Sequence, residues 1–193
     1  MAPLRASDPH ISTEERIQVL KWLEKSHKDF SMAISGVGGA QWTWKPAPAD
    51  WSVGEAAEHV VLAEALLFGL VRKALAVPPN PAWEEQTKGK TELLIRALPS
   101  GEGNALAPEP LVPREGLTRA QVTERSERQH VDIVTFASET QRALKEHTIV
   151  HPFPIFGTLN AYQWLLYVPL HTIHHCKQIA GVKVLPRYPP NSV

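Results

Sequence analysis

Three histidines lie within five positions near the end of the chain, in the stretch HTIHHCKQIAG at residues 171–181. Imidazole is the commonest metal ligand among side chains, so this cluster suggests a metal site. On a helix, His171 and His175 differ by about 40° around the axis and project from one side, the geometry of a two-histidine chelate. The spacing alone would equally pair His171 with His174. A polar, partly solvated turn is the alternative to a metal site.

A third ligand would have to come from another element, and His59 is the candidate. It lies in a segment with helical periodicity, residues 52–75, and shares one face with four apolar residues, Leu62, Ala63, Leu66 and Leu70. A polar ring inside an apolar stripe needs a hydrogen-bond partner or a metal ion. A neutral core histidine bonded to a neighbouring side chain is therefore the alternative. Three imidazoles with room for water would form an open site of the catalytic type.

Two further residues could line the site from outside the ligand set. His27 lies between Leu20, Phe30 and Ile34 on an expected helix, where it is a pocket residue, a core histidine or a partly solvated interface residue. Gln178 follows His175 by about one helical turn and could orient an imidazole ring or a bound water. No residue is assigned a catalytic role, because no carboxylate base is clearly placed.

The composition restricts the class of protein. Twenty Lys and Arg residues balance twenty Asp and Glu residues, so the chain lacks the net positive charge on which general nucleic-acid binding depends. It holds no apolar run of about 18 residues, and no membrane span is expected. The N-terminal MAPLRASDPH has no apolar core like that of a secretory signal, and the lone Cys176 rules out an intramolecular disulfide. Both features favour the cytoplasm.

Four long helices are expected to position these side chains. Capping boxes, in which a Ser or Thr pairs with a Glu or Gln three positions later, predict helix starts at Ser12, Ser52 and Thr118. Together with the proline and glycine boundaries, they predict helices at residues 12–36, 52–76, 118–147 and 158–182. Pro169 is expected to kink the last helix or to open its hydrogen bonding locally.

The predicted fold is all-α, an antiparallel four-helix bundle in a single domain of residues 1–193. A long connection, residues 78–117, joins the second and third helices and holds several clusters of proline and glycine. A short helix is expected at about Lys90–Leu98, and the remainder is expected to be irregular. No convincing strand pattern is present. Long connections in compact domains are often functional, and substrate is expected to enter beneath this one.

Two stretches of the chain resemble the DinB-like superfamily. They are WSVGEAAEHVVLAE, with the Trp51–Ser52 entry and His59, and FGTLNAYQWLLYVPLHTIHHCKQI. The second stretch contributes six matching positions, Gly157, Trp164, His171, His175, Gln178 and Ile179. Members of the superfamily are four-helix bundles with one histidine from the second helix and an H-x3-H pair from the fourth. The resemblance therefore selects His171 with His175 and leaves His174 outside the ligand set.

The resemblance also implies a cofactor and an activity. The cofactor would be one divalent metal ion, zinc or nickel, held by His59, His171 and His175 with water in the other positions. Several relatives are transferases or isomerases that use bacillithiol, mycothiol or glutathione, so the expected function is a metal-dependent transferase acting with a small thiol and an electrophilic substrate. The alternatives are a metal-binding or stress-response module without turnover and a metal-dependent hydrolase. Whether turnover occurs stays open, and a homodimer is one assembly to test.

Overall fold

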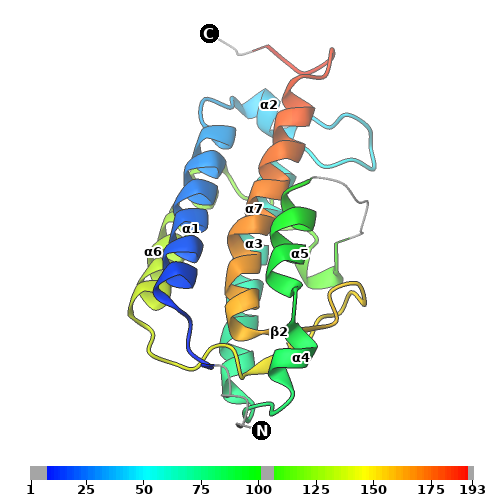
Figure 1. Cartoon of the computed structure of the whole chain (residues 1–193). Helices are drawn as coiled ribbons and strands as arrows, with labels where there is room; N and C mark the ends of the chain where they lie inside the picture. Colours follow the sequence, from blue (N-terminus) through cyan, green and yellow to red (C-terminus); the bar gives the residue numbers. More distant parts are fainter. Residues whose placement is uncertain (1–7, 101–106, 191–193) are drawn as a thin grey trace, which may run out of the picture.

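The computed structural model describes residues 8–100 and 107–190. Residues 1–7, which begin the segment MAPLRASDPH, and residues 101–106 of the 78–117 connection lie outside the described residues. The protein is mostly helical, as predicted. Four long helices lie side by side (Figure 1): α1 (Thr13–Ile34), α3 (Val53–Ala76), α6 (Arg119–Glu139) and α7 (Ala161–Lys183). The most extensive contacts join α7 to α3 and to α1, and α6 packs against α1 and α3.

The helix starts follow the local sequence. The predicted capping boxes are present at Ser12, Ser52 and Thr118, where each side chain accepts the backbone N–H three residues later. A fourth box, Asn160 with Gln163, starts α7 and was not predicted. These caps satisfy backbone donors that have no partner within the helix. Helix α7 continues through Pro169.

The segment between α6 and α7 differs from the prediction. Helix α6 ends at Glu139, eight residues before the predicted end at His147. Two short strands follow, β1 (Thr148–Val150) and β2 (Thr158–Asn160), which pair antiparallel. The prediction of no strand was therefore wrong. Strands of three residues are too short for an alternating apolar pattern to appear in the sequence.

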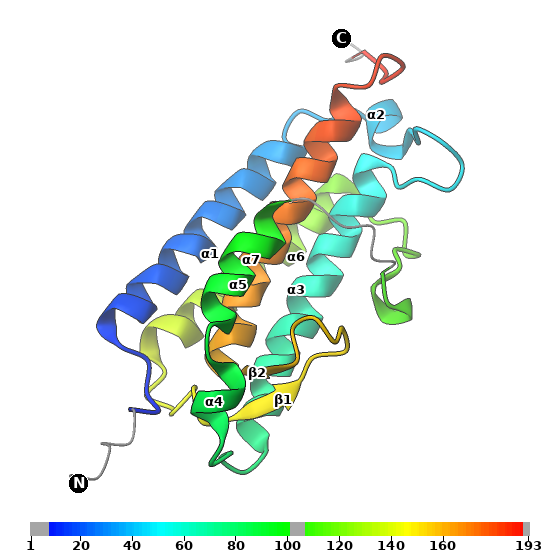
Figure 2. The ribbon, with the colours of Figure 1, turned by 45° about the vertical axis from the view of Figure 1, so that its right-hand side comes forward.

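The long connection after α3 is more regular than predicted. It contains α4 (Trp83–Thr87), α5 (Lys90–Ala97) and two 3₁₀ turns, η1 (Leu98–Ser100) and η2 (Glu109–Leu111). Helix α5 was predicted and α4 was not. Figure 2 shows α5 lying along α7, and α5 and η1 both contact α7. Because α1, α3 and α5 surround it, α7 is buried on nearly all sides over its first ten residues.

The core has two apolar clusters along the length of the helices. One includes Leu23, Phe68 and Leu166, and the other includes Phe30, Val60 and Ile179. Near the level where they meet, four polar side chains are buried, Ser26, Glu64, Ser126 and Thr172. No helix among the described residues has both the length and the apolar character needed to cross a membrane.

Gly54 at the start of α3 leaves room for an indole ring from α2 (Gly39–Thr43). Trp42 Nε1 donates to the Leu117 carbonyl at 2.9 Å, and a Cβ added at Gly54 would lie 2.6 Å from the same nitrogen. We therefore expect Gly54→Ala to lower the free energy of unfolding by about 1–3 kcal/mol in urea denaturation, although alanine favours helix. The control is Gly69→Ala in the same helix, where the added Cβ meets nothing within 4 Å. It should stabilise the protein by about 0.5–1 kcal/mol, and equal effects at both positions would contradict this packing.

Candidate metal centre

Three histidines that are far apart in the sequence meet between α3 and α7. His59, His171 and His175 each offer one ring nitrogen, and these atoms lie within 4.8 Å of one another. Nε2 of His171 and Nε2 of His175 are 3.2 Å apart. Two ligands at about 2.0–2.1 Å from one tetrahedral ion are separated by about 3.3–3.4 Å, so this spacing fits a shared metal ion.

Helix α3 presents His59 at the edge of its buried face. The predicted stripe was partly wrong, because Leu66 is 40% exposed, whereas Val60, Ala63 and Val71 are fully buried. His59 is nonetheless buried, since the chain outside α3 covers it. The Trp51 ring packs against His59, with 4.8 Å between the ring centroids. The Leu111 carbonyl of the η2 turn contacts Nδ1 of the same histidine.

Hydrogen bonds hold two of the three rings with Nε2 directed at the common point. Nδ1 of His59 donates to the Leu111 carbonyl at 2.7 Å, and Nδ1 of His175 contacts Gln178 Oε1 at 2.7 Å. A neutral imidazole has one hydrogen, so each ring keeps a free lone pair on Nε2. Nδ1 of His171 is buried without a partner among the described residues. Packing against the Tyr167 ring, at a centroid distance of 6.0 Å, holds that ring instead.

Burial favours the neutral form of the three imidazoles, and no acidic side chain in the described part of the chain affects their pKa values. Burial is the main cause that lowers the pKa of His59, lowers that of His171 well below its usual value, and lowers that of His175 to about 3. Repulsion from nearby histidines lowers these pKa values further, and no described carboxylate opposes it. Converging lone pairs repel one another unless a proton or a cation lies between them. The donor set therefore fits a divalent transition metal ion such as zinc or nickel.

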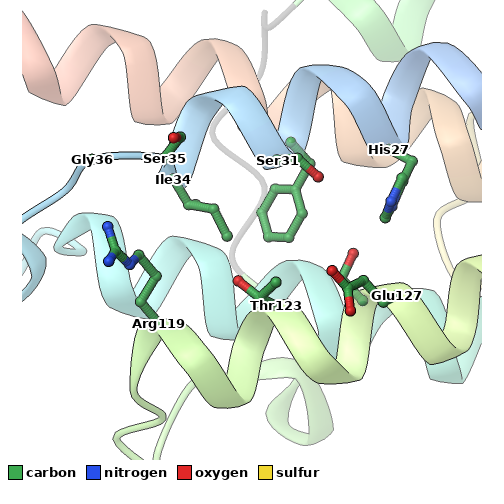
Figure 3. Close-up of a pocket in the computed structure, with 10 residues that line it drawn as sticks. His27, Ser31, Ile34, Ser35, Gly36, Arg119, Thr123 and Glu127 are labelled. Atoms are coloured by element: carbon green, nitrogen blue, oxygen red, sulfur yellow. The ribbon is translucent and has the colours of Figure 1, made fainter.

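His27 lies apart from this cluster. It lines a pocket of about 420 Å³ between α1 and α6, and Figure 3 shows it facing Glu127 across that pocket. Its ring stacks on His130 with 4.0 Å between centroids. Of the two outer residues predicted, Gln178 thus contacts the three-histidine cluster, whereas His27 belongs to the pocket between α1 and α6.

The sequence analysis missed Glu58, which precedes His59. Its carboxylate is 1% exposed and accepts three backbone N–H groups of the returning connection, from Arg114 at 2.6 Å, Glu115 at 2.8 Å and Leu117 at 3.0 Å. Adjacent residues of α3 thus bind the same connection, Glu58 through 114–117 and His59 through Leu111. The signal in the sequence was a charged residue within the apolar run AAEHVV.

Glu58→Gln should loosen the connection that orients His59. The amide replaces one acceptor oxygen with a donor, so at least one backbone N–H loses its charge-assisted partner. We expect the free energy of unfolding to fall by about 2–3 kcal/mol and metal affinity to fall by about tenfold or more. Urea denaturation of the metal-free protein and competition titration with zinc measure the two effects. Unchanged zinc affinity would show that the connection does not support His59.

The family model described as the DinB superfamily matches residues 23–179, which include the three histidines. No curated protein and no solved structure matches the chain significantly.

Proposed function

We propose that this chain, which belongs to the DinB superfamily, is a metal-dependent transferase that acts with a low-molecular-weight thiol. His59, His171 and His175 would hold one zinc or nickel ion, and the four long helices would form the antiparallel four-helix bundle of the family. The observation that carries the proposal is the convergence of three neutral imidazoles without a carboxylate beside them.

A neutral ligand set suits an anionic partner. Three imidazoles leave the full charge of a divalent ion uncompensated, so the low-dielectric surroundings favour an anion at the remaining position. A bound metal ion would lower the pKa of a coordinated thiol, so that the thiolate is present at neutral pH. Gln178 would hold the His175 ring in place.

The surroundings of the three histidines suggest the character of the electrophile. The half-buried Trp51 ring packs against His59 and supplies apolar, aromatic surface. Such surface excludes water and contacts a flat, uncharged molecule more favourably than a charged one. We therefore propose an uncharged electrophile with unsaturated or aromatic character.

A hydrolase is the less favoured alternative. Metal-assisted hydrolysis commonly uses a carboxylate as general base beside the water. Among the described residues, no acidic side chain influences the pKa values of the three histidines. Thiol transfer needs no such base, because the thiolate is itself the nucleophile.

The proposal is tested by assaying metal-loaded protein for thiol consumption. Glutathione, bacillithiol, mycothiol and coenzyme A are each assayed with a model aromatic electrophile. We expect one thiol to be consumed, with loss of turnover on chelation and in His171→Ala. Cobalt-loaded protein should gain a near-ultraviolet absorption band with the same thiol. The control is His147→Ala, which removes a half-buried histidine whose Nδ1 contacts the Val77 carbonyl at 2.8 Å.

Two other outcomes would replace the proposal. Metal-dependent ester cleavage without thiol would favour the hydrolase. Metal binding without any response to thiols would favour the non-catalytic module. The proposal also includes residence in the cytoplasm and assembly as a homodimer. Light scattering on the purified protein tests the homodimer.

A further inference from the structure

His174 lies beside the three-histidine cluster and belongs to a chain of hydrogen bonds that ends at His175. His174 Nδ1 lies 3.1 Å from the Leu98 carbonyl oxygen in the η1 turn. His174 Nε2 lies 3.1 Å from Gln178 Nε2. Gln178 Oε1 lies 2.7 Å from His175 Nδ1. One backbone carbonyl of the long connection is thus linked through two side chains to a candidate metal ligand.

The donors and acceptors among these groups determine the position of each hydrogen in the series of hydrogen bonds from Leu98 to His175. A carbonyl oxygen only accepts, so His174 Nδ1 carries a hydrogen and donates it to Leu98. A neutral imidazole carries one hydrogen, so when Nδ1 of His174 donates to Leu98, its Nε2 is an acceptor. Only the amide nitrogen of Gln178 can donate to it. The amide oxygen then faces His175, which must carry its hydrogen on Nδ1 and keep a lone pair on Nε2.

The reverse orientation of the amide is unfavourable. If Gln178 turned its oxygen to His174 Nε2, the His174 ring would need a second hydrogen and would be a partly buried cation. The amide nitrogen would then face His175 Nδ1 and favour the tautomer with hydrogen on Nε2, which cannot bind a metal ion through that nitrogen. Without an acceptor at residue 174, no contact among the described residues would select one amide orientation.

We infer that His174 is a positioning residue, which acts through Gln178 to keep Nε2 of His175 free for a metal ion. The inference rests on the proposed metal site and assigns no ligand role to His174. The Leu98 carbonyl of η1 orients His175 indirectly, through His174 and Gln178. The Leu111 carbonyl of η2 orients His59 directly. The connection between α3 and α6 therefore provides two carbonyl groups that orient the metal ligands.

His174→Ala should weaken zinc binding by about tenfold while leaving a stoichiometry of one, because loss of an outer hydrogen-bond partner typically lowers metal affinity by about 10–100-fold. His174→Gln places an amide oxygen near the former Nε2 and should restore most of the affinity. In the metal-free protein, long-range ¹H–¹⁵N spectra of the imidazole rings should show His175 as the Nδ1–H tautomer. The same spectra of His174→Ala should show a mixture of both tautomers.

A double substitution separates this role from a general packing effect. Gln178→Glu supplies a carboxylate, whose two oxygens both accept, so His175 keeps its hydrogen on Nδ1 without help from residue 174. In that background His174→Ala should change zinc affinity by less than about twofold, whereas a packing role predicts the same loss in both backgrounds. His147→Ala is the matched control, since it also removes an imidazole that contacts a backbone carbonyl.

Failure of the role proposed for His174 can be distinguished from failure of the proposed function. If the wild type binds no divalent metal, the proposed function is wrong, and the tautomer ratio of His175 still decides the inference. If the wild type binds zinc, and His174→Ala changes neither affinity nor tautomer ratio, the inference is overturned. The same loss in the Gln178→Glu background also overturns it.

Discussion

Replacing His59, His171 or His175 by alanine should lower zinc affinity by about two to three orders of magnitude. Apparent binding free energies of about 10–16 kcal/mol for four-ligand zinc sites correspond to about 2.5–4 kcal/mol for each ligand, and each 1.4 kcal/mol is a factor of ten. The three ring nitrogens lie within 4.8 Å of one another, so no single loss is compensated by moving one ring. Competition titration with a chromophoric chelator measures the affinity of each variant.

Three control variants make this result specific. His174→Ala should show a much smaller loss and His147→Ala none, because neither ring offers a nitrogen to the cluster. His27→Ala should also retain full affinity, since His27 lines the pocket between α1 and α6. If His174→Ala lost as much zinc affinity as His175→Ala, the ligand pair on α7 would be the wrong one.

The second large effect concerns Glu64, which is buried in the core between the long helices. Its Oε1 lies 2.9 Å from Thr172 Oγ1, which is also 3.3 Å from the Val168 carbonyl. Burial raises the pKa of Glu64 from 4.5 to about 7, against the opposing effect of the Thr172 hydrogen bond. A protonated Glu64 can donate to Thr172, whose own hydrogen then goes to Val168.

This raised pKa makes stability depend on pH. The folded protein holds the Glu64 proton more tightly than the unfolded chain, so the stabilisation is complete below about pH 4.5 and is lost as pH rises towards 7. A shift of this size predicts a loss of about 2–3 kcal/mol in the free energy of unfolding between about pH 5 and 8. Glu64→Gln removes the ionisation, so its advantage over wild type should grow by that amount over the same range. Urea denaturation of metal-free protein at several pH values measures it.

Thr172→Val is the control for this prediction. It removes the hydroxyl partner but keeps the carboxyl group, so the pH-dependent loss should persist or increase. A parallel pH dependence in wild type and Glu64→Gln would show that another group is responsible.

The sequence by itself predicted features that depend on short stretches of chain. The helix starts at Ser12, Ser52 and Thr118 were predictable because a cap and its partner are three residues apart. The i, i+4 spacing of His171 and His175 likewise defines one face of a helix. The family was predicted from residues at fixed spacing and is confirmed by the match over residues 23–179. The role of the three histidines as metal ligands stays a prediction.

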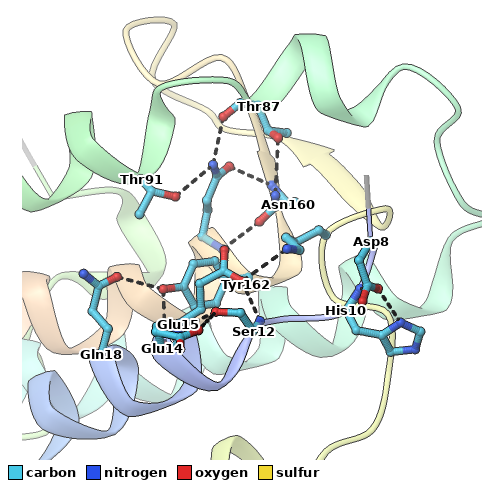
Figure 4. Close-up of polar contacts among 12 residues, drawn as sticks. Asp8, His10, Ser12, Glu14, Glu15, Gln18, Thr87, Thr91, Asn160 and Tyr162 are labelled. Carbon is cyan, nitrogen blue, oxygen red and sulfur yellow. Dashed lines mark hydrogen bonds and ion pairs between the residues drawn. The ribbon is translucent and has the colours of Figure 1, made fainter. Parts of the chain in front are cut away.

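Tertiary contacts overrode the local pattern in several places. Helical periodicity continues past Glu139, but the chain leaves the helix there and continues to β1, which pairs with β2. Gln163 could have been recognised as a cap partner of Asn160. Its second contact, a 2.9 Å hydrogen bond to the Thr87 carbonyl, required α4 to pack against β2 beside the start of α7. Figure 4 shows Thr87 next to Asn160, the N-cap residue of α7.

The orientation of the metal ligands was also decided only by the tertiary structure. From the residues alone His171 could pair with His174 or His175, and only the family resemblance selected between them. The acceptors that orient the rings include the backbone carbonyls of Leu98 and Leu111, which carry no signature in a sequence because every residue has one. Glu58 and Glu64 lie among apolar neighbours on α3, and their roles follow from partners more than fifty residues away. Spacing along a helix thus determines which side chains share a face, whereas the long-range fold determines which atoms face them.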